Sequence, residues 1–282
     1  MSKSFFTSII LILVLLVSCS GEPKPKKTVN DFNFLWNFSE SKYLTYSYEM
    51  TSIDKETYVR DSAPHTMKTE IIGDMVITSQ GNRTGVLSTV NLTKTISNLT
   101  DKGEWSYAEP RPLNNSIVGE LTQYSQFNNT RLDALWDAYL PLPLEEIKEG
   151  ESYKLRMSLP EGMENNKYVH GFNTLTFKGY ETIQNRKCIV LTGVIEVKDA
   201  DELEFEGEHI HFITGTGTYY FDPKEHIYVK AEVKITLVRK VDSGIKEDVK
   251  KDLFLDRTIN EAFKIELKEI KVNTKASHRS HK

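Results

Sequence analysis

From residue 227 to residue 241 apolar and polar side chains alternate with few breaks. Because successive side chains of a β-strand point to opposite faces, this pattern predicts a strand with one buried and one solvent-facing side, as is typical of an antiparallel sheet. Fifteen residues at about 3.3 Å each would extend about 50 Å, well beyond a usual strand, so we expect a large, curved sheet. The apolar positions are Ile227, Val229, Ala231, Val233, Ile235 and Leu237; the polar positions are Tyr228, Lys230, Glu232, Lys234 and Thr236.

Further strands are predicted on both sides of this one, separated by residues that favour turns. The segment 263–272 alternates at first and then shifts register at Glu269, which indicates a strand with a bulge; an amphipathic helix is the alternative. The other expected strands cover residues 44–50, 74–79, 84–96, 174–181, 187–198, 214–221 and 250–255, with turns at 81–83, 184–186, 222–226 and 242–244.

One segment, residues 130–139, departs from the period of two. Its apolar residues have helical spacing, Thr130 can cap its start, and Pro141 and Pro143 follow its end. We therefore predict a mainly β fold, a large curved antiparallel sheet resembling a half-barrel, with one short helix covering part of the concave face. The apolar residues with this spacing are Leu132, Leu135, Trp136 and Tyr139. Core packing is the expected role of Leu132, Trp136 and Tyr139, and contact with a ligand is the alternative.

The N-terminus has the layout of a secretory signal. Lys3 precedes an apolar run at residues 5–17, which is too short to span a bilayer permanently. The run ends in Leu16-Val17-Ser18-Cys19, which resembles a bacterial lipobox. This resemblance implies cleavage before Cys19 and lipidation of that residue; an ordinary signal peptide cleaved near Ser20 or Gly21 is the alternative.

The lipobox resemblance also implies a place in the bacterial cell envelope. Ser20 stands where an Asp would favour inner-membrane retention, so we expect an outer-membrane anchor. Residues 21–27 alternate Pro with Lys and lack apolar side chains, which predicts an extended tether, and their basic character favours a protein that faces the periplasm. The expected organisation is a signal peptide at 1–18, the anchored Cys19 and a flexible linker at 19–31, a single mainly-β domain at 32–272 and a polar tail at 273–282.

Charge and cysteine content limit the possible functions. The formal net charge is −4, and it becomes −5 without the signal peptide because Lys3 is lost. This charge balance lacks the excess of basic residues that is typical of nucleic-acid-binding proteins. Cys19 and Cys188 are the only cysteines, so lipidation of Cys19 would leave no partner for a disulfide. Cys188 lies in a strand-like run, where a buried, unreactive thiol is expected.

Several short patterns suggest chemistry, and none is specific. His209 and His211 would share one face of a strand and are weak candidates for metal ligands; His170 and His226 are the possible third ligands. Solvent-facing imidazoles are the simpler interpretation, and we predict no cofactor. The acidic run 199–208 lacks the spacing and turn glycine of an EF-hand, so it is interpreted as a solvated loop.

Two other patterns are interpreted structurally. Gly215-Thr216-Gly217-Thr218 precedes a strand and not a helix, so close approach of a backbone or an aromatic ring explains it better than phosphate binding. The chain contains no Gly-x-Ser-x-Gly elbow that would indicate a Ser-His-Asp hydrolase.

A second resemblance extends over residues 140–240. The segment up to Gly150-Glu151-Ser152-Tyr153, the strand pair around Gly179 and Cys188, and residues 215–222 are similar to features of bacterial envelope lipoproteins without an assigned activity. At the level of fold, the expected bent sheet resembles lipoprotein carriers. We therefore expect a non-enzymatic binding role, with an apolar ligand, a lipid or an envelope protein as partner. A hydrolase or metal-dependent enzyme and a purely structural lipoprotein are the alternatives.

Overall fold

The computed structural model describes residues 34–38, 42–58, 64–80, 83–127, 133–160, 168–198, 208–241 and 254–272. All of them belong to one compact unit, Asn33–Lys282. The elements are β1(Lys42–Tyr58), β2(His65–Ser79), β3(Thr84–Asn98), β4(Arg111–Pro112), β5(Ser116–Thr122), α2(Asp133–Tyr139), β6(Ser152–Pro160), β7(Tyr168–Ile183), β8(Arg186–Lys198), β9(Glu208–Asp222), β10(Ile227–Val241) and β11(Phe254–Val272). None of the described helical residues forms a segment long and apolar enough to cross a membrane.

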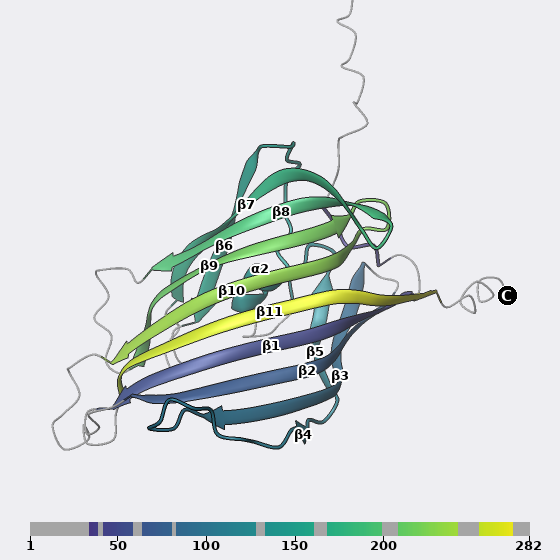
Figure 1. Cartoon of the computed structure of the whole chain (residues 1–282). Helices are drawn as coiled ribbons and strands as arrows, with labels where there is room; N and C mark the ends of the chain where they lie inside the picture. The colour runs from purple at the N-terminus through teal and green to yellow at the C-terminus, as the bar shows by residue number, and fades with distance from the viewer. Residues whose placement is uncertain are drawn as a thin grey trace, which may run out of the picture. The chain divides into compact units, whose positions relative to one another are not determined.

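The strands form a single open antiparallel sheet (Figure 1). Its order is β4-β3-β2-β1-β11-β10-β9-β8-β7-β6, and β5 pairs with the other end of β3. The first and last long strands meet at the centre, where β1 pairs with β11 from Lys42 opposite Val272 to Tyr58 opposite Phe254. Strands before and after α2 in the chain thus belong to one sheet, as the predicted large antiparallel sheet requires.

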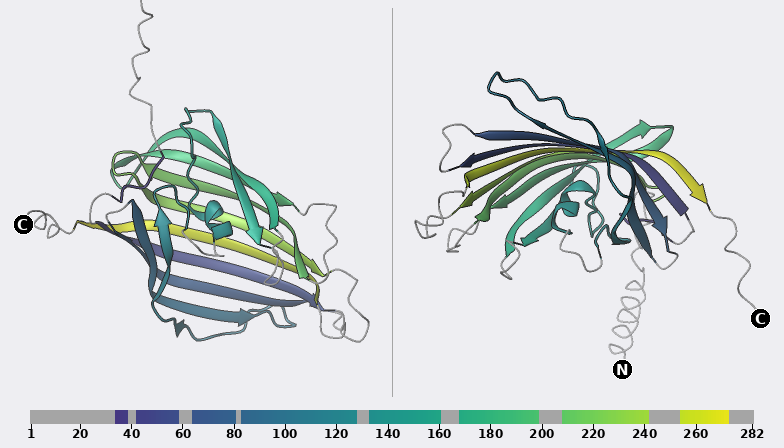
Figure 2. Two further views of the ribbon diagram at one scale, coloured as in Figure 1. Left: turned by 180° about the vertical axis from the view of Figure 1, so that it is seen from behind. Right: turned by 90° about the horizontal axis from the view of Figure 1, so that it is seen from below.

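The sheet is strongly bent, and α2 lies inside the bend (Figure 2). The helix contacts β6 and β10 across the concave face. It begins at Asp133 and ends at Tyr139, within the predicted range 130–139, while Thr130 and Leu132 lie outside the described residues. The predicted fold class, a large curved antiparallel sheet with one short helix, is therefore confirmed for the part of the chain that the structure describes.

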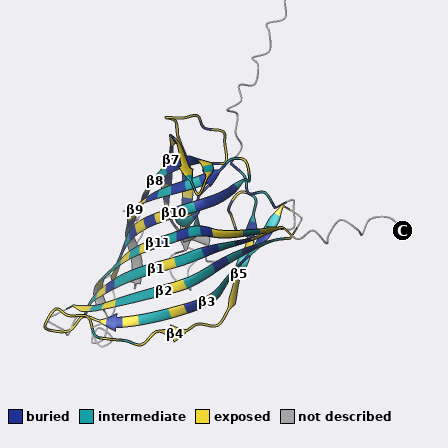
Figure 3. Ribbon diagram, turned by 45° about the vertical axis from the view of Figure 1, so that its right-hand side comes forward, coloured by how far each residue is buried: buried dark blue, intermediate teal, exposed yellow. Residues whose placement is uncertain are grey.

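Burial alternates along the strands as the sequence predicts (Figure 3). The expected apolar positions of β10, from Ile227 to Leu237, are buried. The assignment of Tyr228 to the polar face is wrong, because its side chain is fully buried. A register shift between Tyr228 and Lys230 interrupts the pairing with β9, and the irregularity lets three consecutive side chains enter the core.

The predicted bulge near Glu269 is confirmed. Thr45 of β1 lies opposite Glu269 and Tyr46 lies opposite Leu267, so Lys268 is the extra residue. Phe263, Ile265 and Leu267 alternate regularly on the buried face, and the extra residue after them places Ile270 opposite the buried Leu44. The amphipathic-helix alternative for this segment is excluded, since β11 runs through it to Val272.

The glycines of β9 make room for an aromatic ring, as the sequence indicated. A Cβ atom on Gly217 would lie 2.1 Å from Tyr219 Oη, and one on Gly193 would lie 3.1 Å from Tyr219 Cε2. Gly193 and Gly217 are directly paired neighbours on β8 and β9. The Tyr219 side chain therefore lies flat across the sheet over two residues that lack side chains.

Aromatic residues before β1 complete the core at one end of the concave face. Trp36 stacks on Phe38 with ring centroids 5.7 Å apart and meets Tyr228 edge-on at 5.4 Å. The ring centroids of Phe34 and Phe221 are 5.9 Å apart.

Cys188 is buried, as predicted, and burial together with the charge of Asp222 raises the pKa of its thiol to about 11. The thiol is therefore protonated and unreactive at neutral pH.

Substitution of Gly217 by Ala should destabilise the protein by about 1–3 kcal/mol, because the new methyl group overlaps the Tyr219 ring. Urea unfolding followed by circular dichroism measures the change. Thr216→Val, at the next residue of the strand, should alter the free energy of unfolding by less than about 0.5 kcal/mol. Equal effects of the two substitutions would show that the Tyr219 ring does not occupy this place.

Candidate ligand-binding cavity on the concave face

Side chains of the sheet hold the C-terminal end of α2. The last carbonyl groups of a helix have no partner within the helix and need other donors. Asn173 Nδ2 donates a hydrogen bond to Asp137 O at 3.0 Å, and Tyr219 Oη donates one to Ala138 O. The sheet thus satisfies two buried carbonyls of a helix that has only seven residues.

The chain just after α2 is fixed in the same way. Ser125 Oγ donates to Leu140 O, and Tyr228 Oη donates to Pro141 O. Trp36 Nε1 donates to Ser125 Oγ at 3.2 Å and so ties the aromatic segment before β1 to the same place. These contacts join β7, β9, β10 and the turn after β5 to one short stretch of chain.

The buried tyrosines remain protonated donors at physiological pH. Desolvation by burial raises the pKa of Tyr219 and of Tyr228, and that of Tyr46, whose hydroxyl donates to Tyr228 O at 3.0 Å. A protonated phenol can donate a hydrogen bond to a carbonyl, whereas a phenolate cannot. The tyrosine hydrogen bonds that fix α2 and the residues after it are therefore insensitive to pH around neutrality.

A cavity of about 210 Å³ lies between α2 and the sheet. Trp136 and Tyr139 of α2 form one side, and Phe263 of β11 forms part of the other. Tyr139 stacks on Phe263 at 4.5 Å, and Trp136 meets the same ring edge-on at 6.3 Å. We call this space the α2 cavity; its lining residues are Tyr48, Met75, Leu87, Thr89, Val118, Trp136, Tyr139 and Phe263.

The described lining of the α2 cavity is mainly apolar. Its described lining residues are apolar or aromatic apart from Thr89 and the two tyrosine hydroxyls. Tyr139 Oη donates to Glu261 Oε2 at 2.6 Å; burial first, and then the charge of Glu261, raises the pKa of Tyr139. The same two causes raise the pKa of Tyr48 to about 12. A lining with these residues can enclose a hydrocarbon group.

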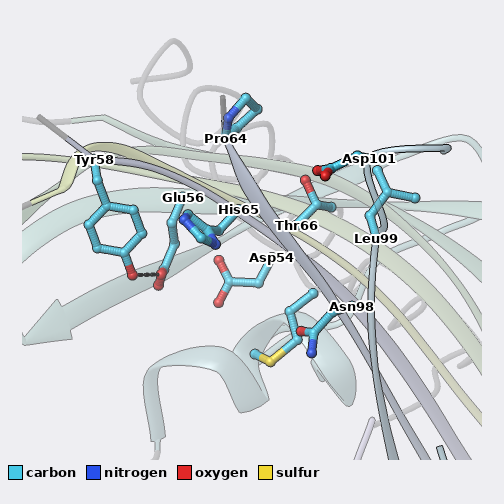
Figure 4. Close-up of a pocket in the computed structure, with 10 residues that line it drawn as sticks. Asp54, Glu56, Tyr58, Pro64, His65, Thr66, Asn98, Leu99 and Asp101 are labelled. Atoms are coloured by element: carbon cyan, nitrogen blue, oxygen red, sulfur yellow. Dashed lines mark hydrogen bonds between the residues drawn. The ribbon is translucent and has the colours of Figure 1, made fainter. Parts of the chain in front are cut away.

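A second hollow, of about 630 Å³, lies at the far end of β1 and β2 (Figure 4). Asp54, Glu56 and Tyr58 reach it from β1, and His65 reaches it from β2. Tyr58 Oη donates to Glu56, and this hydrogen bond is the main cause of the raised pKa of Tyr58. We call this space the distal pocket; Pro64, Thr66, Met67, Asn98, Leu99 and Asp101 complete its described lining.

An arginine next to the distal pocket is already paired. Arg257 Nε lies 3.1 Å from both carboxylate oxygens of Asp54, and its Nη2 contacts the same group at 2.5 Å. Arg257 Nε also lies 3.2 Å from Glu56 Oε1. Asp54 is buried, so this forked ion pair satisfies a carboxylate that would otherwise be costly to enclose.

The four candidate metal ligands come from β7, from β9 and from the turn between β9 and β10. The backbone of His209 and His211 lies in β9, but their side chains are outside the described residues. A register shift between Ile210 and Phe212 interrupts the strict alternation on which that prediction depended. His170 is exposed with Nδ1 3.0 Å from Ser158 Oγ, and His226 Nδ1 lies 3.2 Å from Leu35 O. Among the described residues, no group of three or more His, Cys, Asp or Glu is placed to hold a metal.

Other sequence predictions fall outside the described part of the chain, or were incomplete. Cys19 and residues 199–207 are not among the described residues. Trp136 and Tyr139 were expected in the core; both are half-buried and line a cavity. The pairing of Asp54 with Arg257 joins residues 203 positions apart, so no local sequence signal could have found it.

Comparison with solved structures identifies a similar fold. A structure of lipovitellin that concerns lipid–protein interactions matches with a TM-score of 0.50 and 13% identity, over 86% of this chain and 27% of that one. This chain thus spans about a quarter of the lipovitellin chain, and the likeness concerns the fold alone. No protein-family model matches the sequence, and no curated protein matches at a significant level.

Two bacterial structures also align over most of their length. An outer membrane lipoprotein-sorting protein domain from Vibrio parahaemolyticus aligns over 83% of this chain and 87% of its own, with 9% identity and a TM-score of 0.15. A DUF1329 family protein from Desulfovibrio piger aligns over 85% and 88%, with 9% identity and a TM-score of 0.13. TM-scores this low do not establish a shared fold.

Replacement of Tyr219 or Tyr228 by Phe should cost about 1–3 kcal/mol each, because a buried carbonyl at or just after α2 loses its donor. Chemical unfolding of the full chain measures the loss. The matched control is Tyr220→Phe, since Tyr220 is the neighbour of Tyr219 and is only partly buried. If all three substitutions had the same small effect, the sheet would not hold the helix through these hydroxyls.

Proposed function

We propose that this chain is a lipid-anchored envelope protein whose concave face binds an apolar ligand, such as the acyl chain of a lipid, without catalysis. The α2 cavity is the observation that supports this proposal most directly, because it is an apolar space inside the bend of an open sheet. The likeness to lipovitellin, whose structure concerns lipid–protein interactions, agrees with a lipid ligand.

The size of the α2 cavity limits what can enter it. Its 210 Å³ exceeds the roughly 150 Å³ of an apolar cavity that holds benzene, but is below the ~300 Å³ at which pockets for drug-sized molecules begin. The cavity therefore accepts the end of a hydrocarbon chain and not a whole lipid. Each methylene group removed from water contributes about 0.8 kcal/mol, so several suffice for measurable binding.

Membrane attachment through Cys19 is the second part of the proposal. The signal-like segment ends at this residue, and the Pro- and Lys-rich residues that follow would separate the domain from the bilayer. Several acyl chains on one residue give an attachment that is effectively permanent. The absence of Asp at position 20 supports the outer membrane, with the domain facing the periplasm.

An envelope protein is a second candidate partner, supported by one edge of the sheet. Tyr107 is 87% exposed and Ile117 is 75% exposed, and Trp105 and Leu113 are also exposed in the same part of the chain. Exposed apolar side chains gathered along a short segment are typical of contact surfaces. Binding at this edge would leave the α2 cavity free, so the two candidate functions can be separated by experiment.

Quenching of Trp136 fluorescence by brominated fatty acids tests the lipid-binding proposal. The Cys19→Ala form of the full chain avoids the need for detergent. Because Trp136 lines the α2 cavity, bromine on the inserted tail should quench the Trp136 fluorescence, and the quenching should reach a plateau as the fatty-acid concentration rises. The quenching should disappear in Trp136→Phe and persist in Trp105→Phe, since Trp105 lies elsewhere beside Lys68.

A steric variant distinguishes entry into the cavity from adsorption on the surface. Val118→Phe should fill the α2 cavity and weaken binding, whereas Val194→Phe, at a half-exposed position of β8, should leave binding unchanged. Quenching that does not saturate, or that survives in Trp136→Phe, would contradict the proposed ligand site.

Cell fractionation tests the anchor. Cys19→Ala, in a chain whose residues 1–18 are exchanged for an ordinary cleavable signal peptide, should move the protein from the membrane to the soluble fraction, because the acylated residue is lost. The matched control is Cys188→Ala, which removes the only other cysteine and should leave the protein in the membrane fraction. Retention of the Cys19→Ala protein in the membrane would show that attachment does not depend on this residue.

A further inference from the structure

The α2 cavity and the distal pocket open on the same face of the sheet. Tyr48 lines the first, and Asp54, Glu56 and Tyr58 line the second. Tyr48, Asp54 and Glu56 lie an even number of positions apart on β1, and the pairing of β1 with β2 has no register shift from Tyr48 to Glu56; Tyr58 follows a shift in the pairing with β11. Even spacing on a regular strand places side chains on one face. On β2, Met75 of the α2 cavity and His65 of the distal pocket are also an even number of positions apart.

The surface between the two hollows changes gradually from apolar to polar. Next to the α2 cavity, Met50 lies opposite Phe263 on one side and Ile71 on the other. Two residues further along β1, Ser52 lies opposite Glu261 and Thr69. Tyr139 covers the β11 side of this stretch, because it stacks on Phe263 and donates to Glu261. The half-buried residues that a ligand could contact are therefore on β1 and β2; they are Met50, Ser52, Thr69 and Ile71.

The length of this path matches an extended acyl chain. Six residues separate Tyr48 from Asp54, which is about 20 Å at ~3.3 Å per residue. This distance exceeds the ~15 Å depth of one leaflet of acyl chains in a bilayer, half of the hydrocarbon core, so a long chain must be nearly fully extended to cover it. A chain whose end occupies the α2 cavity would therefore place its polar head at the distal pocket.

The distal pocket suits a head group that donates hydrogen bonds. Its described lining includes the carboxylates of Asp54, Glu56 and Asp101 but no Lys or Arg. The nearby Arg257 is already paired with Asp54 and Glu56, so it adds one positive charge against three negative ones. An anionic head would meet repulsion here, whereas an ammonium or hydroxyl group would find acceptors.

We propose that the ligand is a single amphiphile that lies along β1, with its tail in the α2 cavity and a cationic or hydroxyl-bearing head in the distal pocket. This inference rests on the proposed lipid-binding function and extends it to the orientation and head-group class of the ligand. Selectivity would come from the distal pocket, and most of the affinity from the apolar part of the path.

Three probes with the same long alkyl tail test the proposal: a primary amine, an alcohol and a carboxylic acid. Each competes with the brominated fatty acid for the Trp136 site of the Cys19→Ala chain at neutral pH. The amine should bind most tightly and the acid most weakly. The ratio of their binding affinities, the amine-to-acid ratio, should be about tenfold, equivalent to ~1.4 kcal/mol. Equal binding of the three probes, or tighter binding of the acid, would overturn the head-group assignment.

Charge-removing variants locate the selectivity. Glu56→Gln and Asp101→Asn, combined in one chain, should reduce the amine-to-acid ratio toward unity while the alcohol binds as before. Glu49→Gln is the control, because it removes one negative charge from β1 at an exposed position on the other face. If the ratio fell as much in Glu49→Gln, the distal pocket would not be its source. Displacement by none of the probes would contradict the proposed function itself.

Discussion

The hydrogen bonds from the sheet to α2 and the segment after it are the interaction on which the concave face depends. A helix of seven residues is not stable on its own in water, so its position must come from tertiary contacts. Asn173 and Tyr219 bind carbonyls of the helix, and Ser125 and Tyr228 bind the next two. Without these donors the helix would have no fixed place, and the cavity beneath it would have no second wall.

The open sheet explains why such a helix is needed. A closed barrel fills its interior with side chains from every strand, whereas a bent open sheet leaves its concave face to be covered. Trp36 and Phe38 cover one end, and α2 covers the middle. Toward the far end the inner face becomes polar, ending at the ion pair of Asp54 and Arg257. The concave face therefore presents an apolar-to-polar gradient to anything that binds along it.

Local patterns were sufficient to predict most of the fold. The period of two located the long strands, the glycines of β9 indicated close approach of a ring, and the change of pattern at Glu269 indicated the bulge opposite Thr45. Each of these signals lies within a few consecutive residues. The assignment of Tyr228 failed because a register shift depends on the partner strand, which the sequence of β10 alone does not contain.

The candidate site could not be predicted, because distant segments form it. Tyr139 and its partner Glu261 are 122 positions apart, and the α2 cavity takes its lining from β1, β2, β3, β5, α2 and β11. Helical spacing predicted that residues 133–139 have an apolar side. It did not show that two of these aromatic residues would border an unfilled space.

The central claim is that the concave face holds an apolar ligand, and native mass spectrometry of the protein purified from its own membranes tests it most directly. Denaturing mass spectrometry of the same sample gives the mass of the covalently modified chain. The account predicts an additional, non-covalent mass in the native spectrum that organic extraction recovers as an amphiphile with an acyl or alkyl chain. Identical native and denatured masses, with no extractable hydrocarbon compound, would contradict it.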